Sequence, residues 1–123
     1  MASVHKAVTR KRFKEANLVL EAHMSELGIS FEREYLICEG RKWRADYAFL
    51  SHFTVNSIAA WVLVEIEGAV WTSGRHTRGS GYVKDLEKYR VASALGYRLY
   101  RFSTQEILNG TAKAFLEKWH ARI

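Results

Sequence analysis

The segment Trp61–Gly68, with the sequence WVLVEIEG, most constrains the fold, because it reads as a central strand that carries two carboxylates. Alternate side chains of a strand point to opposite faces, so Glu65 and Glu67 point to the same side. Two carboxylates at this spacing repel one another and resist ionising together unless a cation or a basic group lies between them. The pattern indicates a divalent-metal site, and a solvated strand end beside basic residues is the alternative.

The length of the chain fits one compact domain over residues 1–123, with a core large enough to fold unaided. The single cysteine, Cys38, cannot form an internal disulfide, so nothing requires an oxidising compartment. No apolar run approaches the roughly 20 residues of a membrane span. The basic amino terminus leads into an amphipathic segment rather than a signal-peptide core. We therefore expect a cytoplasmic protein that does not associate with a membrane.

The charge of the chain points to a polyanionic partner such as nucleic acid. The formal net charge is +6, and 13% of the residues are aromatic. Basic residues crowd the early turns of a first predicted helix, namely Lys6, Arg10, Lys11, Arg12 and Lys14. These turns either contact phosphates or form a solvated charged face.

Hydrophobic periodicity predicts an α/β fold in which a central mixed sheet is flanked by helices. The expected elements are a helix over 5–27, strands over 31–37, 42–50 and 61–68, a helix over 83–95, a strand over 97–102, and a closing helical segment from 103 that Asn109–Gly110 interrupts. Residues 51–60 are expected to form a connection. The strand–helix–strand step is expected to be a right-handed parallel crossover.

Apolar residues at helical spacing, among them Ala16, Leu20 and Met24, predict an amphipathic first helix. A stripe on the closing segment, formed by Ala112, Phe115, Leu116, Trp119 and Ile123, is expected to pack in the core rather than to form a partner surface, and Ser103 with Glu106 has the form of a capping box at the start of this segment.

Two further residues can join the glutamates at one site. Asp46 is a lone acid in an apolar and aromatic strand, and it can lie beside Glu65 on the neighbouring strand. Lys88 falls on one stripe of the helix over 83–95 together with Asp85 and Ala92. It either faces the carboxylates or pairs with Asp85 at the surface.

A glycine-rich basic loop follows the glutamate strand. Between Ala69 and Gly81, glycines alternate with Arg75, His76 and Arg78. Glycine lets backbone N–H groups approach a phosphate, and arginine supplies bidentate donors. The loop is not a nucleotide-binding P-loop, because the Gly-Lys-Ser/Thr ending is absent.

Several motifs together carry a resemblance to a known family: RKWRADYA at 41–48, VEIEG at 64–68, Trp71, DLEKY at 85–89 and LGYRLYRF at 95–102. With the order αβββαβα, the chain resembles the PD-(D/E)XK nuclease superfamily over nearly its whole length. It is most similar to small endonuclease-like domains related to very-short-patch repair endonucleases, which occur in bacteria and their phages. The resemblance implies a restriction-endonuclease-like core in a bacterial or phage-infected cytoplasm.

The resemblance also implies roles for individual residues. Asp46 matches the first acid of the family motif, although Ala45 replaces the usual proline, and Glu65 matches the second acid. The backbone carbonyl of Ile66 occupies the position of a further metal ligand. Glu15 resembles a first-helix glutamate that some members add to the metal shell.

The main departure from the family pattern is Glu67, which stands where the motif lysine is expected. Glu67 either binds the metal or acts as a general base, or Lys88 brings the missing ammonium from the following helix. Asp46, Glu65, Glu67 and Lys88 are therefore the expected catalytic residues.

The expected activity is endonucleolytic hydrolysis of DNA with Mg²⁺ or Mn²⁺, because these hard cations take oxygen ligands from one or two carboxylates. The cysteine and the histidines show no spacing typical of a structural zinc site. The expected DNA-contacting residues are Arg41, Lys42, Arg44, Arg75, His76 and Arg78. The sequence leaves open whether the protein is a monomer or a homodimer, and an inactive nucleic-acid-binding module of the same fold is the alternative function.

Overall fold

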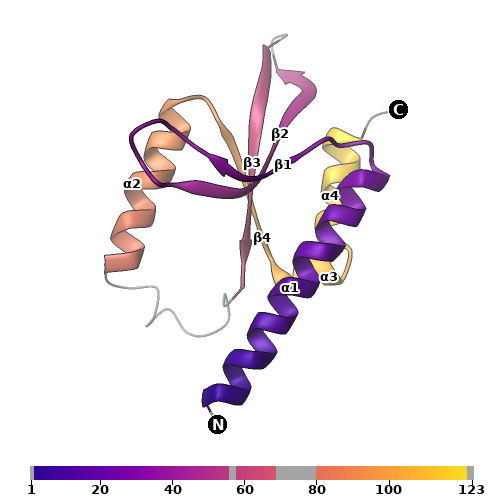
Figure 1. Cartoon of the computed structure of the whole chain (residues 1–123). Coiled ribbons are helices and arrows are strands. Elements are labelled where there is room, and N and C mark those ends of the chain that lie inside the picture. The colour runs from indigo at the N-terminus through magenta and orange to yellow at the C-terminus, as the bar shows by residue number, and fades with distance from the viewer. Residues whose placement is uncertain (1, 56–57, 69–79, 122–123) are drawn as a thin grey trace. The chain divides into compact units, whose positions relative to one another are not determined.

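The computed structural model describes residues 2–55, 58–68 and 80–121. Within these residues the helices and strands follow the expected order, and the closing helical segment is divided in two (Figure 1). The elements are α1 (Ala2–Glu26), β1 (Glu32–Leu36), β2 (Arg44–Val55), β3 (Ile58–Glu67), α2 (Ser80–Ala94), β4 (Arg98–Ser103), α3 (Thr104–Leu108) and α4 (Thr111–His120).

The sheet of the described residues contains four strands in the order β1-β2-β3-β4. β1 pairs with β2 and β2 with β3 in antiparallel fashion, whereas β3 and β4 point the same way in Figure 1. A sheet with neighbours of both kinds is mixed. The predicted α/β class, with a mixed sheet flanked by helices, is confirmed.

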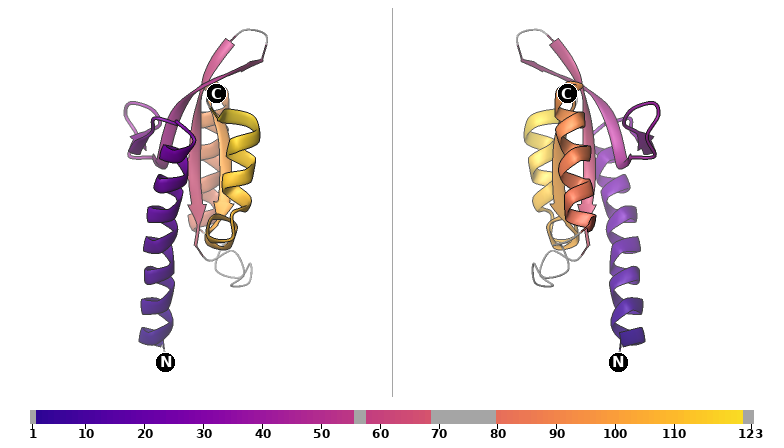
Figure 2. Two further views of the ribbon diagram at one scale, coloured as in Figure 1. Left: turned by 90° about the vertical axis from the view of Figure 1, so that its right-hand side faces the viewer. Right: turned by 90° about the vertical axis from the view of Figure 1, so that its left-hand side faces the viewer.

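The strands β2 and β3 are longer than the sequence predicted. They lie side by side as a hairpin (Figure 2), and their pairing extends through Ser51↔Ala60 to Val55↔Ile58, with a register irregularity between Ser51 and Val55. The expected connection over 51–60 is therefore wrong at both ends. The polar residues of this segment suggested a loop, but 51–55 and 58–60 are strand, and Ser51 is buried within the sheet.

The chain packs as two compact units. One comprises Met1–Ser30, Ile66–Ala69 and Arg101–Ile123, and the other comprises Phe31–Glu65 and Val70–Tyr100. β3 and β4 contribute residues to both units. Glu65 and Glu67, two positions apart on β3, consequently belong to different units.

In the first unit, α1 packs against α3 and α4. Ala16, Leu20 and Met24 recur every four positions, which places them on one stripe of α1, and all three are fully buried. Ile107 on α3 and Leu116 on α4 are also fully buried. The apolar stripe predicted for the first helix is confirmed at these positions.

No described helix is long and apolar enough to cross a membrane.

The break between α3 and α4 follows the sequence prediction. Ser103 and Glu106 form a capping box: the Glu106 backbone N–H donates to Ser103 Oγ at 3.1 Å, and the Ser103 N–H donates to Glu106 Oε1 at 3.0 Å. Asn109 ends α3, and Gly110 adopts a φ of +90°, which glycine permits without strain. This geometry separates the two helices at Asn109–Gly110.

The stripe expected on the last helix is only partly buried. Ala112 and Leu116 are fully buried, whereas Phe115 and Trp119 remain 37% and 40% exposed. Phe115 contacts the ring of Phe102 edge-on, and the Lys118 ammonium lies over the ring of Trp119. Ile123, the last residue of the predicted stripe, lies outside the described residues. The prediction that the whole stripe packs in the core is therefore wrong for Phe115 and Trp119.

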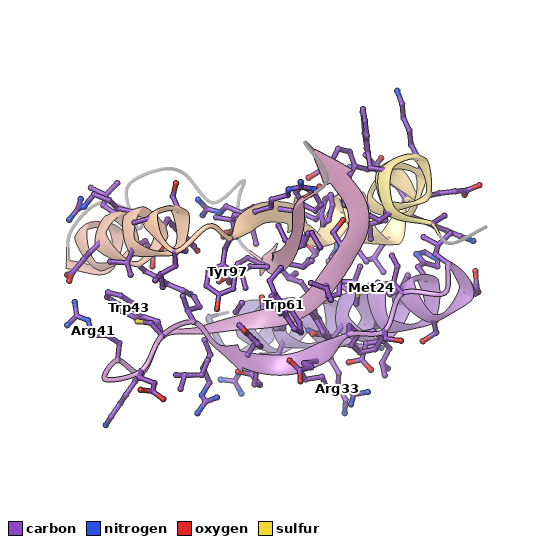
Figure 3. The ribbon with its side chains drawn as sticks, turned by 90° about the horizontal axis from the view of Figure 1, so that it is seen from above. Met24, Arg33, Arg41, Trp43, Trp61 and Tyr97 are labelled. Atoms are coloured by element: carbon purple, nitrogen blue, oxygen red, sulfur yellow. The ribbon has the colours of Figure 1, made fainter. Side chains whose placement is uncertain are left out.

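The second unit has its own core, built from the hairpin, α2 and the turn after β1. Its buried residues are Ile37, Ala45, Ala48, Leu63 and Ala92. Aromatic side chains pack against them, among them Trp43, Trp61 and Tyr97, which Figure 3 shows around this core. Because Ala92 is buried here, the stripe of α2 that contains it faces the sheet.

The strand β1 is short and stands at one end of the sheet order. Its first three residues, Glu32, Arg33 and Glu34, are charged and exposed. Glu34 has a φ of +50°, which is uncommon for a residue with a side chain, and Arg44 Nη1 donates to its carbonyl oxygen at 2.9 Å. The pairing with β2 is therefore interrupted in the middle of β1.

Candidate functional site

The register of β2 and β3 places two acids on one face. Tyr47 pairs with Val64 in the antiparallel ladder. If this register is continued by one step, one residue back on β2 and one residue forward on β3, Asp46 falls opposite Glu65, and cross-strand partners point to the same face. Asp46 is half-buried and Glu65 is buried. The two acids predicted on neighbouring strands thus occupy opposing positions of β2 and β3 by continuation of this register, within the second unit.

Lys88 reaches this face from α2. Its Nζ lies 2.9 Å from Oε1 of Glu65 and donates to the backbone carbonyl of Arg44 at 3.0 Å. Lys88 lies one helical turn before Ala92, so both share the face that packs on the sheet. The alternative partner, Asp85, is exposed. Of the two arrangements that the sequence left open, the structure therefore has Lys88 against a carboxylate of β3.

The contact between Lys88 and Glu65 is shielded from solvent. The two side chains are 14% and 11% exposed. Removing charges from water is costly, and an ion pair in such a place is retained only if the charges and the remaining polar atoms find partners. The Arg44 carbonyl supplies a second acceptor for the ammonium. Lys88, Glu65 and the start of β2 thus form one charged cluster beside Asp46.

Aromatic residues border this face. Tyr35 stacks on Trp61 with ring centroids 5.3 Å apart, and Trp61 shares the face of Glu65 by strand parity. The Tyr97 hydroxyl donates to the Ile37 carbonyl at 3.1 Å and lies 3.1 Å from the Tyr35 hydroxyl. Burial, aided by the Tyr35 hydroxyl, raises the pKa of Tyr97 to about 12.

Tyr35 and Tyr97 were not predicted to lie at this face. The alternating pattern around each tyrosine predicted a strand. It did not predict that the two tyrosine hydroxyls, which are far apart in sequence, lie close together. Only the sheet order and the packing of the second unit bring them together.

In the first unit, Glu67 has a basic partner of its own. Its Oε1 accepts from Nε of Arg101 at 2.7 Å, and Nη2 of Arg101 also lies 2.7 Å away. Two contacts from one guanidinium hold the carboxylate in a defined orientation. Both side chains remain partly exposed, so solvent weakens the pair. Glu67, for which the resemblance implies a lysine position, is therefore an ion-paired acid.

The other residues predicted in the metal shell also lie in the first unit. Glu15 is exposed on α1, and the Ile66 side chain is buried, so its backbone carbonyl is the group that the resemblance assigns. Phe13, two positions before Glu15, packs against Gly68. A Cβ at Gly68 would lie 3.2 Å from the Phe13 ring, so this approach of α1 to the end of β3 favours glycine.

The predicted DNA-contacting residues divide into described and undescribed positions. Arg41, Lys42 and Arg44 are exposed at the turn into β2. Arg41 pairs with Glu87 and lies over the Trp43 ring, 4.2 Å from its centroid, as Figure 3 indicates. The remaining predicted contacts, Arg75, His76 and Arg78, lie outside the described residues.

A second basic surface lies on α1. Four basic side chains are exposed there: Arg10, Lys11, Arg12 and Lys14. The N-terminal part of α1 extends beyond α3 (Figures 1 and 2). By contrast, Lys113 in the same unit is bound to Glu26, with 2.8 Å between the atoms. We call Arg10, Lys11, Arg12 and Lys14 the basic helix segment.

Whether a metal ion can bind here depends on the oxygen, nitrogen and sulfur ligands that the described side chains provide. Within 2–55, 58–68 and 80–121, no three His, Cys, Asp or Glu side chains gather as a metal-binding group. Asp46 and Glu65 offer two carboxylates on one face, and Mg²⁺ is often bound by one or two carboxylates with water and substrate phosphate in the other positions. This donor set suits a hard divalent cation and does not suit zinc.

Comparison with known proteins adds no further assignment. The chain matches no protein-family model, no curated protein and no solved structure.

Proposed function

We propose that the chain is a divalent-metal-dependent endonuclease that hydrolyses phosphodiester bonds in DNA, built on a restriction-endonuclease-like core. The observation that supports the proposal is the cluster in which Lys88 contacts Glu65 beside Asp46 on one face of the sheet. Two acids and a lysine meet there from β2, β3 and α2. This is the combination that phosphodiester hydrolysis requires: oxygen ligands for a cation and a basic group beside them.

Each residue of the cluster has a role in this proposal. Asp46 and Glu65, which both lie in the second unit, hold the cation. The Ile66 carbonyl, Glu67 and Glu15, which the resemblance also assigns to a metal shell, lie in the first unit and have no part in this cluster. When bound, Mg²⁺ or Mn²⁺ neutralises the phosphate, lowers the pKa of a water and stabilises the leaving oxygen. Lys88 orients the attacking water or stabilises the charge that develops on the phosphate.

The basic residues supply substrate binding in the same proposal. Arg41, Lys42 and Arg44 at the start of β2 and the basic helix segment carry exposed positive charge. Contacts of lysine and arginine with phosphates position a nucleic acid without reading its sequence. DNA is therefore the proposed substrate.

A second candidate is a nucleic-acid-binding module that has lost catalysis. The observation that favours it is the pairing of Glu67 with Arg101, since an acid held by arginine replaces the motif lysine. In that case the basic surfaces would bind DNA and the acid cluster would only stabilise the fold.

One experiment separates the two functions. Labelled duplex, nicked, junction and single-stranded DNA are incubated with the protein, with and without Mn²⁺. We expect metal-dependent cleavage of at least one substrate, abolished in Asp46→Asn. Binding without cleavage of any substrate supports the binding module, and cleavage that survives Asp46→Asn rejects this site.

A further inference from the structure

Lys88 is placed where it can control the loading of the metal site. Its ammonium contacts Glu65, one of the two carboxylates that are proposed to hold the cation. We propose that Lys88 is an internal counter-ion that competes with the divalent cation for Glu65, so that metal binding displaces it. This inference rests on the proposed function, because it needs a cation site at Asp46 and Glu65.

The competition follows from the burial of the pair. Glu65 is mostly shielded from water, and a shielded carboxylate is stabilised by a nearby positive charge. Lys88 supplies that charge. A divalent cation bound at the same carboxylate would lie close to the ammonium, and like charges repel strongly where water is largely excluded. The ammonium and the divalent cation therefore cannot both contact Glu65 without repelling each other. Binding of the metal weakens the 2.9 Å contact between Lys88 and Glu65.

The lysine stem allows the ammonium to leave without a change of fold. Four flexible carbons separate the charge from the backbone of α2. The Arg44 carbonyl, at 3.0 Å, already accepts a hydrogen bond from the same nitrogen, so Lys88 keeps an acceptor when it releases Glu65. A small movement within the cluster then exchanges one cation for the other.

Competition with the metal and a purely structural role of the Lys88–Glu65 pair predict different effects of removing Lys88. If Lys88 only stabilises the fold, its removal leaves the affinity for metal unchanged or reduces it through partial unfolding. If Lys88 competes with the metal, its removal increases the affinity. The sign of the change in metal affinity distinguishes the two roles.

The test measures Mn²⁺ binding to the full chain without DNA, by calorimetry or by the electron paramagnetic resonance of free Mn²⁺. Lys88→Met removes the charge and keeps most of the stem, and Lys88→Arg keeps the charge. Lys113→Met is the matched control, since Lys113 is also paired with a glutamate, at 2.8 Å, but in the other unit. We expect Lys88→Met to bind Mn²⁺ at least about fivefold more tightly, the lower end of usual coupling between linked sites. Lys113→Met should bind as the unsubstituted chain does, and Lys88→Arg, which keeps the positive charge, should bind less tightly than Lys88→Met.

A second measurement needs no substitution, so it remains valid if Lys88→Met does not fold. Lysines are labelled with an amine-reactive reagent, and each site is quantified by mass spectrometry with and without Mn²⁺. Linkage is reciprocal, so a metal that displaces Lys88 should increase its labelling. We expect the labelling of Lys88 to rise and that of Lys113 to stay the same.

The outcomes separate failure of the inference from failure of the proposed function. Mn²⁺ binding that needs Asp46 but is not tightened in Lys88→Met, or unchanged labelling of Lys88, overturns the inference and leaves the metal site intact. Absence of Mn²⁺ binding to the unsubstituted chain and to Lys88→Met alike overturns both.

Discussion

Nζ of Lys88 on α2 lies 2.9 Å from Oε1 of Glu65 on β3, in a place where both side chains are largely shielded from water. The contact fixes one helical turn of α2 over the acidic part of the sheet. It also places positive charge beside Asp46, the cross-strand neighbour of Glu65.

Neutralising either acid of the cluster should abolish cleavage. We expect Asp46→Asn and Glu65→Gln to lose Mn²⁺-supported cleavage of labelled DNA, because each change removes an oxygen ligand. DNA binding should be retained or strengthened, since repulsion of the phosphates falls. Glu117→Gln, at an exposed position of α4, is the control and should cleave normally. Normal cleavage by Glu65→Gln would show that the activity belongs elsewhere.

In the proposed nuclease, Glu67 and Lys88 are the two candidates for the role that the resemblance assigns to a motif lysine, and single substitutions separate them. We expect Glu67→Gln and Lys88→Ala each to reduce the single-turnover cleavage rate, by a factor of about 10²–10⁴ where proton transfer is removed. Arg101→Met tests whether Glu67 acts through its ion pair. Equal effects of Arg101→Met and Glu67→Gln would mean that the pair, rather than the carboxylate itself, supports activity.

The basic helix segment should bind backbone phosphates. We expect alanine substitution of Arg10, Lys11 and Lys14 to reduce the slope of log affinity against log salt by about 0.9 for each phosphate of duplex DNA that the variant no longer neutralises. Affinity is measured by fluorescence anisotropy at several salt concentrations. Lys113→Ala is the control, because that lysine is already paired with Glu26. An unchanged slope in the triple variant would exclude this segment from the interface.

The Tyr97 hydroxyl should make stability depend on pH in the alkaline range. The folded protein raises its pKa to about 12 from an ordinary value of 10.0, so the neutral phenol is favoured in the folded state. The stabilisation is complete below about pH 10 and disappears as the pH rises towards about 12. We expect urea unfolding of Tyr97→Phe to show a smaller decline in stability over this interval than the unsubstituted chain. Identical declines would contradict the assigned environment of Tyr97.

The capping box of α3 should stabilise the first unit. We expect Ser103→Ala to lower the free energy of unfolding by about 1 kcal/mol, because the Glu106 N–H loses its acceptor at the end of the helix. Chemical denaturation measures the change. Ser25→Ala, at an exposed position of α1 in the same unit, is the comparison. An unchanged stability in Ser103→Ala would mean that packing alone holds this helix start.

Local patterns in the sequence were sufficient to predict the elements and their faces. The four-residue recurrence of Ala16, Leu20 and Met24 predicted the buried side of α1, and Ser103 with Glu106 predicted a helix start. Both signals arise within one or two turns of chain, where spacing and geometry are directly linked. The element order followed from the same kind of pattern.

Contacts between distant segments could not be read in the same way. The stripe of α2 allowed Lys88 two partners, and only the packing of Ala92 on the sheet decides for Glu65. The pairing of Glu67 with Arg101 depends on two strands being neighbours, which spacing within either strand does not reveal. The hairpin also extends into a polar segment, because cross-strand pairing outweighs the local preference of Ser51 for a turn.

The interruption of β1 at Glu34 has a consequence for self-association. A sheet whose terminal strand is long and flat offers unsatisfied amides and carbonyls to another chain, and edge-to-edge aggregation follows. Here that strand is five residues long, bears exposed charges of both signs and breaks its extended geometry at a φ of +50°. An extended ladder with a second chain is disfavoured at this point, so β1 is expected to resist strand addition by another copy of the protein.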